Sequence, residues 1–220
     1  MNEFMETRNE KYAASLIKAF ERRHMKAFYA RDGRQALTKV MELIPDGAKV
    51  ANGGTMTAAQ IGVFDALRER EKRGEVTFID RSKAVTPEER RTVYLQAFDT
   101  DVYIMGTNAF SEDGQLVNID GNGNRLAALL YGPKSVIVLA SMDKAAATLE
   151  DAIARARHTA APINAQRFDI HTPCKVTGMC GNCNSPDSIC NNIVITRNDS
   201  KNGRIKVILI GETLGFQKAL

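Results

Sequence analysis

The 220-residue sequence contains no tryptophan, only three histidines, and no cysteine outside one short segment near its C-terminus. Aromatic residues make up 6% of the chain, and none is interleaved with the basic clusters to stack nucleic-acid bases. The densest clusters, residues 22–26 and 155–158, are spaced as on solvated helix faces. The net charge of +4 therefore does not indicate a nucleic-acid-binding protein.

Long apolar runs are also missing. No stretch approaches the roughly 18 apolar residues that a transmembrane helix requires. The first residues are polar and acidic, whereas a signal peptide begins with a basic and then an apolar segment. These features predict a cytoplasmic protein that does not bind membranes. Because thiols stay reduced in that compartment, we do not expect the cysteines to form disulfides.

A hydrophobic fraction of 44% is enough for one sizeable core. Hydrophobic periodicity predicts strands over residues 26–30, 49–51, 76–79, 101–106, 115–119, 135–140, 193–196 and 205–210. It predicts helices over residues 7–24, 34–43, 57–73, 87–98, 124–130 and 143–160. Strands separated by single helices predict an α/β fold with a mostly parallel sheet flanked by helices.

Two segments interrupt this alternation. Asp113-Gly114 is a hairpin turn signal and predicts a local antiparallel excursion. Residues 162–191 are irregular and rich in Pro, Gly, Asn and Cys, which is unusual inside a compact domain unless the segment is functional or cross-linked. We expect a single domain over residues 1–220, with a cysteine-rich segment at about 171–191 inserted before the last strands.

Residues 49–57 run from a predicted strand into a predicted helix through Gly53 and Gly54. Glycine lets the backbone turn sharply and approach a ligand closely. The helix start offers unpaired N–H groups with partial positive charge, and Thr55 and Thr57 add hydroxyl groups. The pattern is typical of a carboxylate or phosphate site, and an ordinary turn with a threonine cap is the alternative. It is neither a P-loop nor a dinucleotide fingerprint.

The densest polar stretch covers residues 106–125 and contains four glycines, four asparagines, three carboxylates and one arginine. Asn118 and Asp120 alternate on one strand face, and Arg125 at the next helix start is placed to hold a carboxylate in bidentate fashion. Self-capping turns are the alternative. The predicted anion-binding residues are Gly53, Gly54, Thr55, Thr57, Asn108, Asn118, Asp120, Asn124 and Arg125, and the candidate acid–base carboxylates are Glu112 and Asp120.

These segments carry a resemblance to the LUD (lactate utilisation) domain family. It rests on residues 52–57, 106–114, 118–125, 131–134 and 207–216. Their order and spacing fit the family pattern from about residue 7 to about residue 216. The resemblance implies a NagB/RpiA/CoA-transferase-like α/β fold. Kinship of fold to sugar isomerases and CoA transferases does not assign an activity, and the family supplies no established catalytic residues.

The resemblance also implies a link to bacterial L-lactate oxidation, in which LUD proteins act beside iron–sulfur subunits. The partners that we expect are therefore a small anionic metabolite and iron–sulfur partner subunits. A homo-oligomer is the general expectation for a soluble protein.

All four cysteines, Cys174, Cys180, Cys183 and Cys190, form a C-x5-C-x2-C-x6-C pattern. The two-residue gap between Cys180 and Cys183 lets both thiolates face one metal ion. Four thiolates satisfy an iron–sulfur cluster or zinc, and a metal would order the irregular segment. The spacing matches neither a zinc ribbon nor a ferredoxin. Buried reduced thiols, or a redox-active pair at Cys180 and Cys183, are the alternatives.

Three hypotheses are open at this point. The first is a redox-linked accessory or enzyme of small hydroxy-acid metabolism that binds an anion at the glycine-rich turns. The second is a non-catalytic ligand-binding or assembly subunit with a structural metal. The third is a metal-independent isomerase or acyl transferase. Bound iron with a reducible visible spectrum favours the first, zinc or no metal the second, and turnover that survives cysteine replacement the third.

Overall fold

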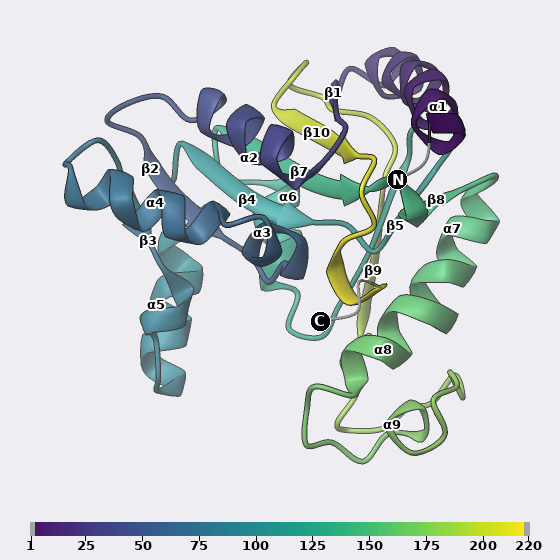
Figure 1. Ribbon diagram of the computed structural model, residues 1–220. Coiled ribbons are helices and arrows are strands. Elements are labelled where there is room, and N and C mark those ends of the chain that lie inside the picture. The colour runs from purple at the N-terminus through teal and green to yellow at the C-terminus, as the bar shows by residue number, and fades with distance from the viewer. Residues whose placement is uncertain (1–2, 218–220) are drawn as a thin grey trace.

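The computed structural model describes residues 3–217 and contains two β-sheets (Figure 1). The larger sheet has six strands in the order β1-β10-β7-β4-β2-β3, and every neighbouring pair is parallel. Its strands are β1 (Lys26–Ala30), β2 (Lys49–Asn52), β3 (Thr77–Ile79), β4 (Val102–Gly106), β7 (Ser135–Ser141) and β10 (Ile205–Ile210). The predicted α/β fold with a mostly parallel sheet is confirmed.

The smaller sheet has the strand order β8-β5-β6-β9. It consists of β5 (Ala109–Ser111), β6 (Leu116–Asp120), β8 (Ala145–Ala146) and β9 (Asn192–Thr196). β5 and β6 form the predicted antiparallel hairpin, and Gly114 in its turn has a φ of +89°. This second sheet is larger than the predicted hairpin, because β9, from late in the chain, pairs with β6, and β8 pairs with β5.

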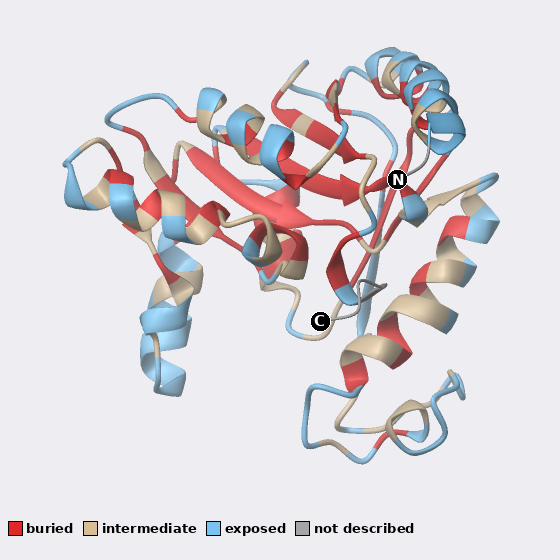
Figure 2. Cartoon of the chain, viewed as in Figure 1, coloured by how far each residue is buried: buried red, intermediate tan, exposed pale blue. Residues whose placement is uncertain are grey.

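Helices cover both faces of the larger sheet (Figure 1). They are α1 (Glu3–Arg22), α2 (Gly33–Glu42), α3 (Met56–Gln60), α4 (Val63–Lys72) and α6 (Asn124–Leu130). The helix α5 (Pro87–Gln96) has no buried residue and projects away from the sheet (Figure 1). Side chains alternate between the two faces of a strand. In β7, Val136 and Val138 pack with α1 and α6, whereas Ile137 and Leu139 pack with α2 and α4. The central strands are accordingly the most buried part of the protein (Figure 2).

A long helical segment packs on the smaller sheet. It comprises α7 (Leu149–Arg155), a π-helical stretch (Ala156–Ala160) and α8 (Ala161–Ala165), and the short α9 (Pro173–Thr177) follows in the cysteine-rich segment. Ala152 and Ala156 contact Val117 and Ile119 of β6 in a third hydrophobic cluster. Within residues 3–217, no helix is both long and apolar enough to cross a membrane.

The single helix predicted over residues 57–73 is wrong, because the structure divides it into α3 and α4. Gly62 separates them and has a φ of +79°, in the left-handed region that interrupts a helix and that glycine adopts without strain. The helix that follows the first glycine-rich turn is therefore only five residues long.

The helix predicted over residues 143–160 begins later than expected and continues further. Residues Met142–Lys144 form a 3-10 turn and the next two residues form β8. The helix starts at Leu149, where the Thr148 side chain accepts a hydrogen bond from the Asp151 backbone N–H. Consequently Lys144 ends the 3-10 turn that follows the carboxyl end of β7 and is not part of the long helix.

Candidate functional site

A cavity of about 740 Å³ lies at the carboxyl ends of β2, β3, β4 and β7. Residues of α5, of the segment from α7 to α8 and of the smaller sheet complete its walls. The carboxyl edge of a parallel sheet is where α/β proteins bind ligands. The cavity volume falls within the range of about 300–1,000 Å³ that is usual for ligand sites.

The cavity wall carries far more positive than negative charge. Its charged side chains are Arg68, Arg81, Arg90, Arg125, Lys144, Arg155 and Arg167, against the two carboxylates of Asp80 and Asp120. Both carboxylates are already paired, Asp80 with Arg68 at 2.9 Å and Asp120 with Arg125 at 3.2 Å. The cavity is thus electropositive.

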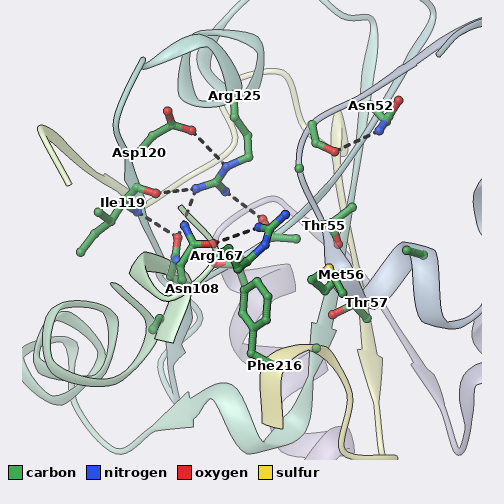
Figure 3. A pocket seen from close by; sticks show the side chains of 18 of the residues that line it. Asn52, Thr55, Met56, Thr57, Asn108, Ile119, Asp120, Arg125, Arg167 and Phe216 are labelled. Atoms are coloured by element: carbon green, nitrogen blue, oxygen red, sulfur yellow. Dashed lines mark hydrogen bonds and ion pairs between the residues drawn. The ribbon is translucent and has the colours of Figure 1, made fainter. Parts of the chain in front are cut away.

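Arg125 is the centre of a buried network (Figure 3). Its Nε donates to Asp120 Oδ2 (3.2 Å), its Nη1 to Gly106 O (3.0 Å) and Asn118 Oδ1 (2.8 Å), and its Nη2 to Ile119 O (2.7 Å) and Asn108 Oδ1 (3.2 Å). A guanidinium has five N–H donors, so all of them are used within the protein. Burial lowers the pKa of Arg125, and the Asp120 carboxylate opposes that effect.

This network changes the interpretation of Arg125. The side chain lines the cavity, but its N–H groups join β4, β6 and the start of α6 and are not directed at a ligand. Arg125 therefore supplies positive charge to the cavity while fixing the position of its wall. Asp120 is held in turn, because its Oδ1 accepts from the Gly123 N–H at 2.8 Å.

The two adjacent glycines have different surroundings. A Cβ atom on Gly53 would lie 2.7 Å from Tyr103 Oη and 2.9 Å from Arg125 Cγ, so close packing inside the protein requires glycine there. Gly54 is exposed, and its nearest neighbour would be Arg81 Nη1 at 3.4 Å. Thr55 is the N-cap of α3 and accepts from the Ala58 N–H at 3.3 Å.

The nine residues predicted to bind an anion come together, with one exception. Those that line the cavity are Gly53, Gly54, Thr55, Thr57, Asn108, Asp120, Asn124 and Arg125. Asn118 is fully buried behind the wall and accepts from Arg125. Glu112, one of the two candidate acid–base carboxylates, lies outside the cavity at the β5–β6 turn, where it accepts from Tyr12 Oη at 2.7 Å.

Four cations in the wall have no carboxylate partner among residues 3–217, and sequence reasoning did not single them out. They are Arg81, Arg90, Lys144 and Arg167. Arg81 lies over the Tyr94 ring at 5.6 Å, and Arg167 lies over the rings of Phe168 and Phe216 at 5.5 and 5.3 Å. Aromatic contacts orient a guanidinium and leave its N–H groups available for an anion.

Lys144 is the least solvated of these four cations. Its side chain is half-buried, and the described part of the chain offers its amine no hydrogen-bond or ion-pair partner. Burial lowers the pKa of Lys144 to about 8. The nearby Asp143 carboxylate opposes this shift, whereas Arg155 and Arg125 add to it.

We expect Lys144→Met to stabilise the ligand-free protein at neutral pH. The folded-state pKa lies below the unfolded value of 10.5, so the cost of burying the charged amine is fully present below pH 8 and is relieved as pH rises toward 10.5. The variant should gain up to about 3 kcal/mol in unfolding free energy at pH 7 and lose this advantage by pH 10.5. Urea unfolding across this pH range measures both effects.

Lys18→Met on the exposed side of α1 is the matched control for this measurement. It removes one lysine charge outside the cavity, so its unfolding free energy should stay close to that of the unmodified protein at every pH. If Lys144→Met and the unmodified protein showed the same dependence on pH, the amine would not be desolvated in the folded state.

The four cysteines do not form a ready metal centre. Over residues 3–217 there is no group of three or more His, Cys, Asp or Glu side chains placed to hold a metal. All four thiols are free and partly buried, and Cys190 packs against the third hydrophobic cluster next to β6. The arrangement does not fit a four-thiolate centre without rearrangement of the segment, and metal binding stays a prediction.

Together these features define an α/β protein with a cationic cavity at the carboxyl edge of a parallel sheet. The model of the LUD domain family matches residues 13–210. The chain belongs to the LUD domain family, as the sequence resemblance predicted. None of the curated proteins matches it.

Among solved structures, the chain is similar to a DUF162 family protein from Deinococcus radiodurans. The TM-score is 0.52 at 10% sequence identity, with 92% of this chain and 98% of the other covered, which supports the fold. Ribose 5-phosphate isomerase A from Neisseria gonorrhoeae matches with a TM-score of 0.35 at 19% identity, over 53% of this chain and 54% of that chain. The 5-methylthioribose 1-phosphate isomerase from Pyrococcus horikoshii matches with a TM-score of 0.38 at 15% identity, over 79% and 53%. With TM-scores below 0.5, the two isomerase matches say nothing about the grouping or activity of this chain.

Proposed function

We propose that this LUD domain protein binds a small carboxylate metabolite of the lactate type, L-lactate or its oxidised form pyruvate, in the cationic cavity. The single observation that supports this most strongly is the set of cations that line one cavity without a carboxylate partner in residues 3–217, Lys144, Arg81 and Arg167 among them. Charge that is left uncompensated in a partly buried site favours an anionic ligand.

The Arg125 network supports the same proposal in a different way. It holds the β4, β6 and α6 segments of the wall in fixed relative positions. A site whose walls are held by internal hydrogen bonds loses little entropy when the ligand enters. The direct contacts to the ligand are then made by the side chains of Arg81, Lys144 and Arg167.

Isothermal titration calorimetry with L-lactate, pyruvate and neutral lactamide tests the proposal. We expect the two acids to bind, lactamide to bind at least about tenfold more weakly, and acid binding to weaken as salt rises. A phosphorylated three-carbon acid belongs in the same series, because the cavity is larger than one lactate. Equal affinity for lactate and lactamide, or no binding by any of these compounds, would contradict the proposal.

Arg81→Met and Arg167→Met identify the residues responsible. Each variant should weaken binding of the carboxylate about ten- to a hundredfold, since a charge-assisted hydrogen bond contributes roughly 1.5–3 kcal/mol. Neither side chain has a carboxylate partner among the described residues, so folding should be little affected. Lys18→Met again serves as the control, with unchanged affinity expected.

The redox part of the original hypothesis is a separate proposal that rests on the four cysteines. Anaerobic purification followed by iron, zinc and acid-labile sulfide analysis tests it. Near-stoichiometric iron and sulfide with a band that bleaches on reduction would support electron transfer. Zinc alone would support a structural role for the segment, and absence of metal would leave the cysteines as ordinary thiols.

A further inference from the structure

Three features of Lys144, taken together, indicate a functional role for this residue. It follows the carboxyl end of a central strand, it lines the cavity, and its amine lacks a hydrogen-bond or ion-pair partner in residues 3–217. A lysine that serves folding alone is usually solvated or paired. This amine faces the cavity in which we propose that a carboxylate metabolite binds.

The space beside the amine is open. A Cβ atom on Gly215 would lie 3.7 Å from Lys144 Nζ and 3.4 Å from Thr57 Oγ1, so the missing side chain at residue 215 leaves room between these two groups. Thr57 also lines the cavity, and its hydroxyl has no hydrogen-bond partner within the described chain. A ligand carbonyl that meets Lys144 therefore has a hydroxyl donor close by.

Burial disfavours the charged form of Lys144 and, together with the charges around it, lowers the pKa to about 8. Desolvation is the largest cause, and the guanidinium groups of Arg155 and Arg125 add to it, while Asp143 acts in the opposite direction. Asp143 forms an ion pair with Arg155 at 3.4 Å, and this pairing weakens its attraction for the Lys144 amine. Roughly a tenth of such amines are unprotonated at pH 7, far more than for a solvated lysine.

We propose that Lys144 forms a reversible imine with the carbonyl carbon of a small 2-oxo acid held in the cavity. This inference rests on the proposed function, because the cavity cations would hold the carboxylate while the amine meets the adjacent carbonyl. Desolvated lysines in apolar or cationic surroundings are the ones that form such bonds.

The step conserves atoms and electrons. The unprotonated amine of Lys144 attacks the carbonyl carbon, so that a C–N bond forms, the C=O π bond breaks, and one amine proton passes to the carbonyl oxygen. The carbinolamine then loses that oxygen as water together with the second amine proton, as the C–O bond breaks and the nitrogen lone pair forms the C=N bond. Nothing is oxidised or reduced, and the carboxylate of the ligand stays ionised throughout.

Borohydride trapping with pyruvate tests the proposal on the full chain. Borohydride reduces an imine to a stable secondary amine, so intact-mass and peptide analysis should show one N-(1-carboxyethyl) adduct per chain, located at Lys144. L-Lactate, which has no carbonyl, should give no adduct and should compete with pyruvate. The initial rate of trapping should rise between pH 7 and 9 with a midpoint near 8.

Two variants make the test decisive. Lys144→Met should lose the adduct, whereas Lys18→Met, which removes an exposed lysine outside the cavity, should keep it. If calorimetry showed pyruvate bound to the unmodified protein and no adduct formed, or if Lys144→Met were labelled equally well, the imine would be ruled out while the proposed function stood. If pyruvate neither bound nor was trapped, both would fail.

Discussion

Replacing Arg125 with methionine is expected to lower the free energy of unfolding by about 3–5 kcal/mol, the loss typical when one partner of a buried ion pair is removed. Methionine has a stem of similar length but no donors. Asp120 would then be left without its cation, and the carbonyls of Gly106 and Ile119 would lose their N–H partners. Urea unfolding followed by circular dichroism measures the loss.

A milder variant keeps this prediction testable even if Arg125→Met does not fold. Arg125→Lys retains the charge but not the five-donor fork, so we expect a loss of about 1–3 kcal/mol. Asp120→Asn keeps a similar shape and should cost less than removal of the arginine. If Arg125→Met unfolded with nearly normal free energy and lost only anion binding, Arg125 would be a ligand clamp and our structural role for it would be wrong.

The second large effect is expected at Gly53, with Gly54 as its matched control. Alanine at Gly53 places a Cβ atom 2.7 Å from Tyr103 Oη and 2.9 Å from Arg125 Cγ, and neither side chain is free to move. We expect a loss of about 1–3 kcal/mol, as for overpacked cores. Alanine at Gly54 meets only the flexible end of Arg81 at 3.4 Å and should change stability by less than about 0.5 kcal/mol.

The same pair of variants separates two roles of the first glycine-rich turn. If both glycines served only the close approach of a ligand, both alanine variants would keep the stability of the unmodified protein and would lose only ligand affinity. Thermal unfolding and calorimetry with L-lactate on both proteins distinguish the cases. Equal melting temperatures for the two variants would contradict the packing role that we assign to Gly53.

Strands and helices bounded by clear turn residues could be predicted from the sequence. β1, α6 and β10 occur over the residues expected, because apolar runs there end at glycine, asparagine or charged residues. The first of two failures has a local cause. Gly62 alone breaks the predicted helix over residues 57–73, and a single glycine inside a helical pattern is a weak signal.

The second wrong prediction concerns the segment that contains Lys144. Helical spacing predicted one helix over residues 143–160, and nothing in that pattern singled out Lys144. In the structure β8 pairs with β5, and this long-range contact holds residues 145–146 in a strand. A short strand that depends on a partner 35 residues away leaves no periodic signal in the sequence. The available clue was position, since Lys144 closely follows a buried apolar strand.

The candidate site was predicted in part for a similar reason. Glycine- and asparagine-rich turns indicated where the cavity walls lie, because those residue types permit tight turns. The sequence did not show that Arg125 is fully engaged, since its partners include main-chain carbonyls up to 19 residues away. Arg81 and Arg167, which have no carboxylate partner among residues 3–217, come from separate helical and loop segments, and only the fold brings them to one cavity.

A crystal structure determined with saturating pyruvate tests the central claim most directly. We predict that the ligand occupies the cavity, with its carboxylate near Arg81 or Arg167 and its carbonyl carbon near Lys144. Arg125 should still bind Asp120 and the carbonyls of Gly106 and Ile119. Pyruvate bound at another place on the protein, or Arg125 turned away from Asp120 to hold the carboxylate, would contradict this account.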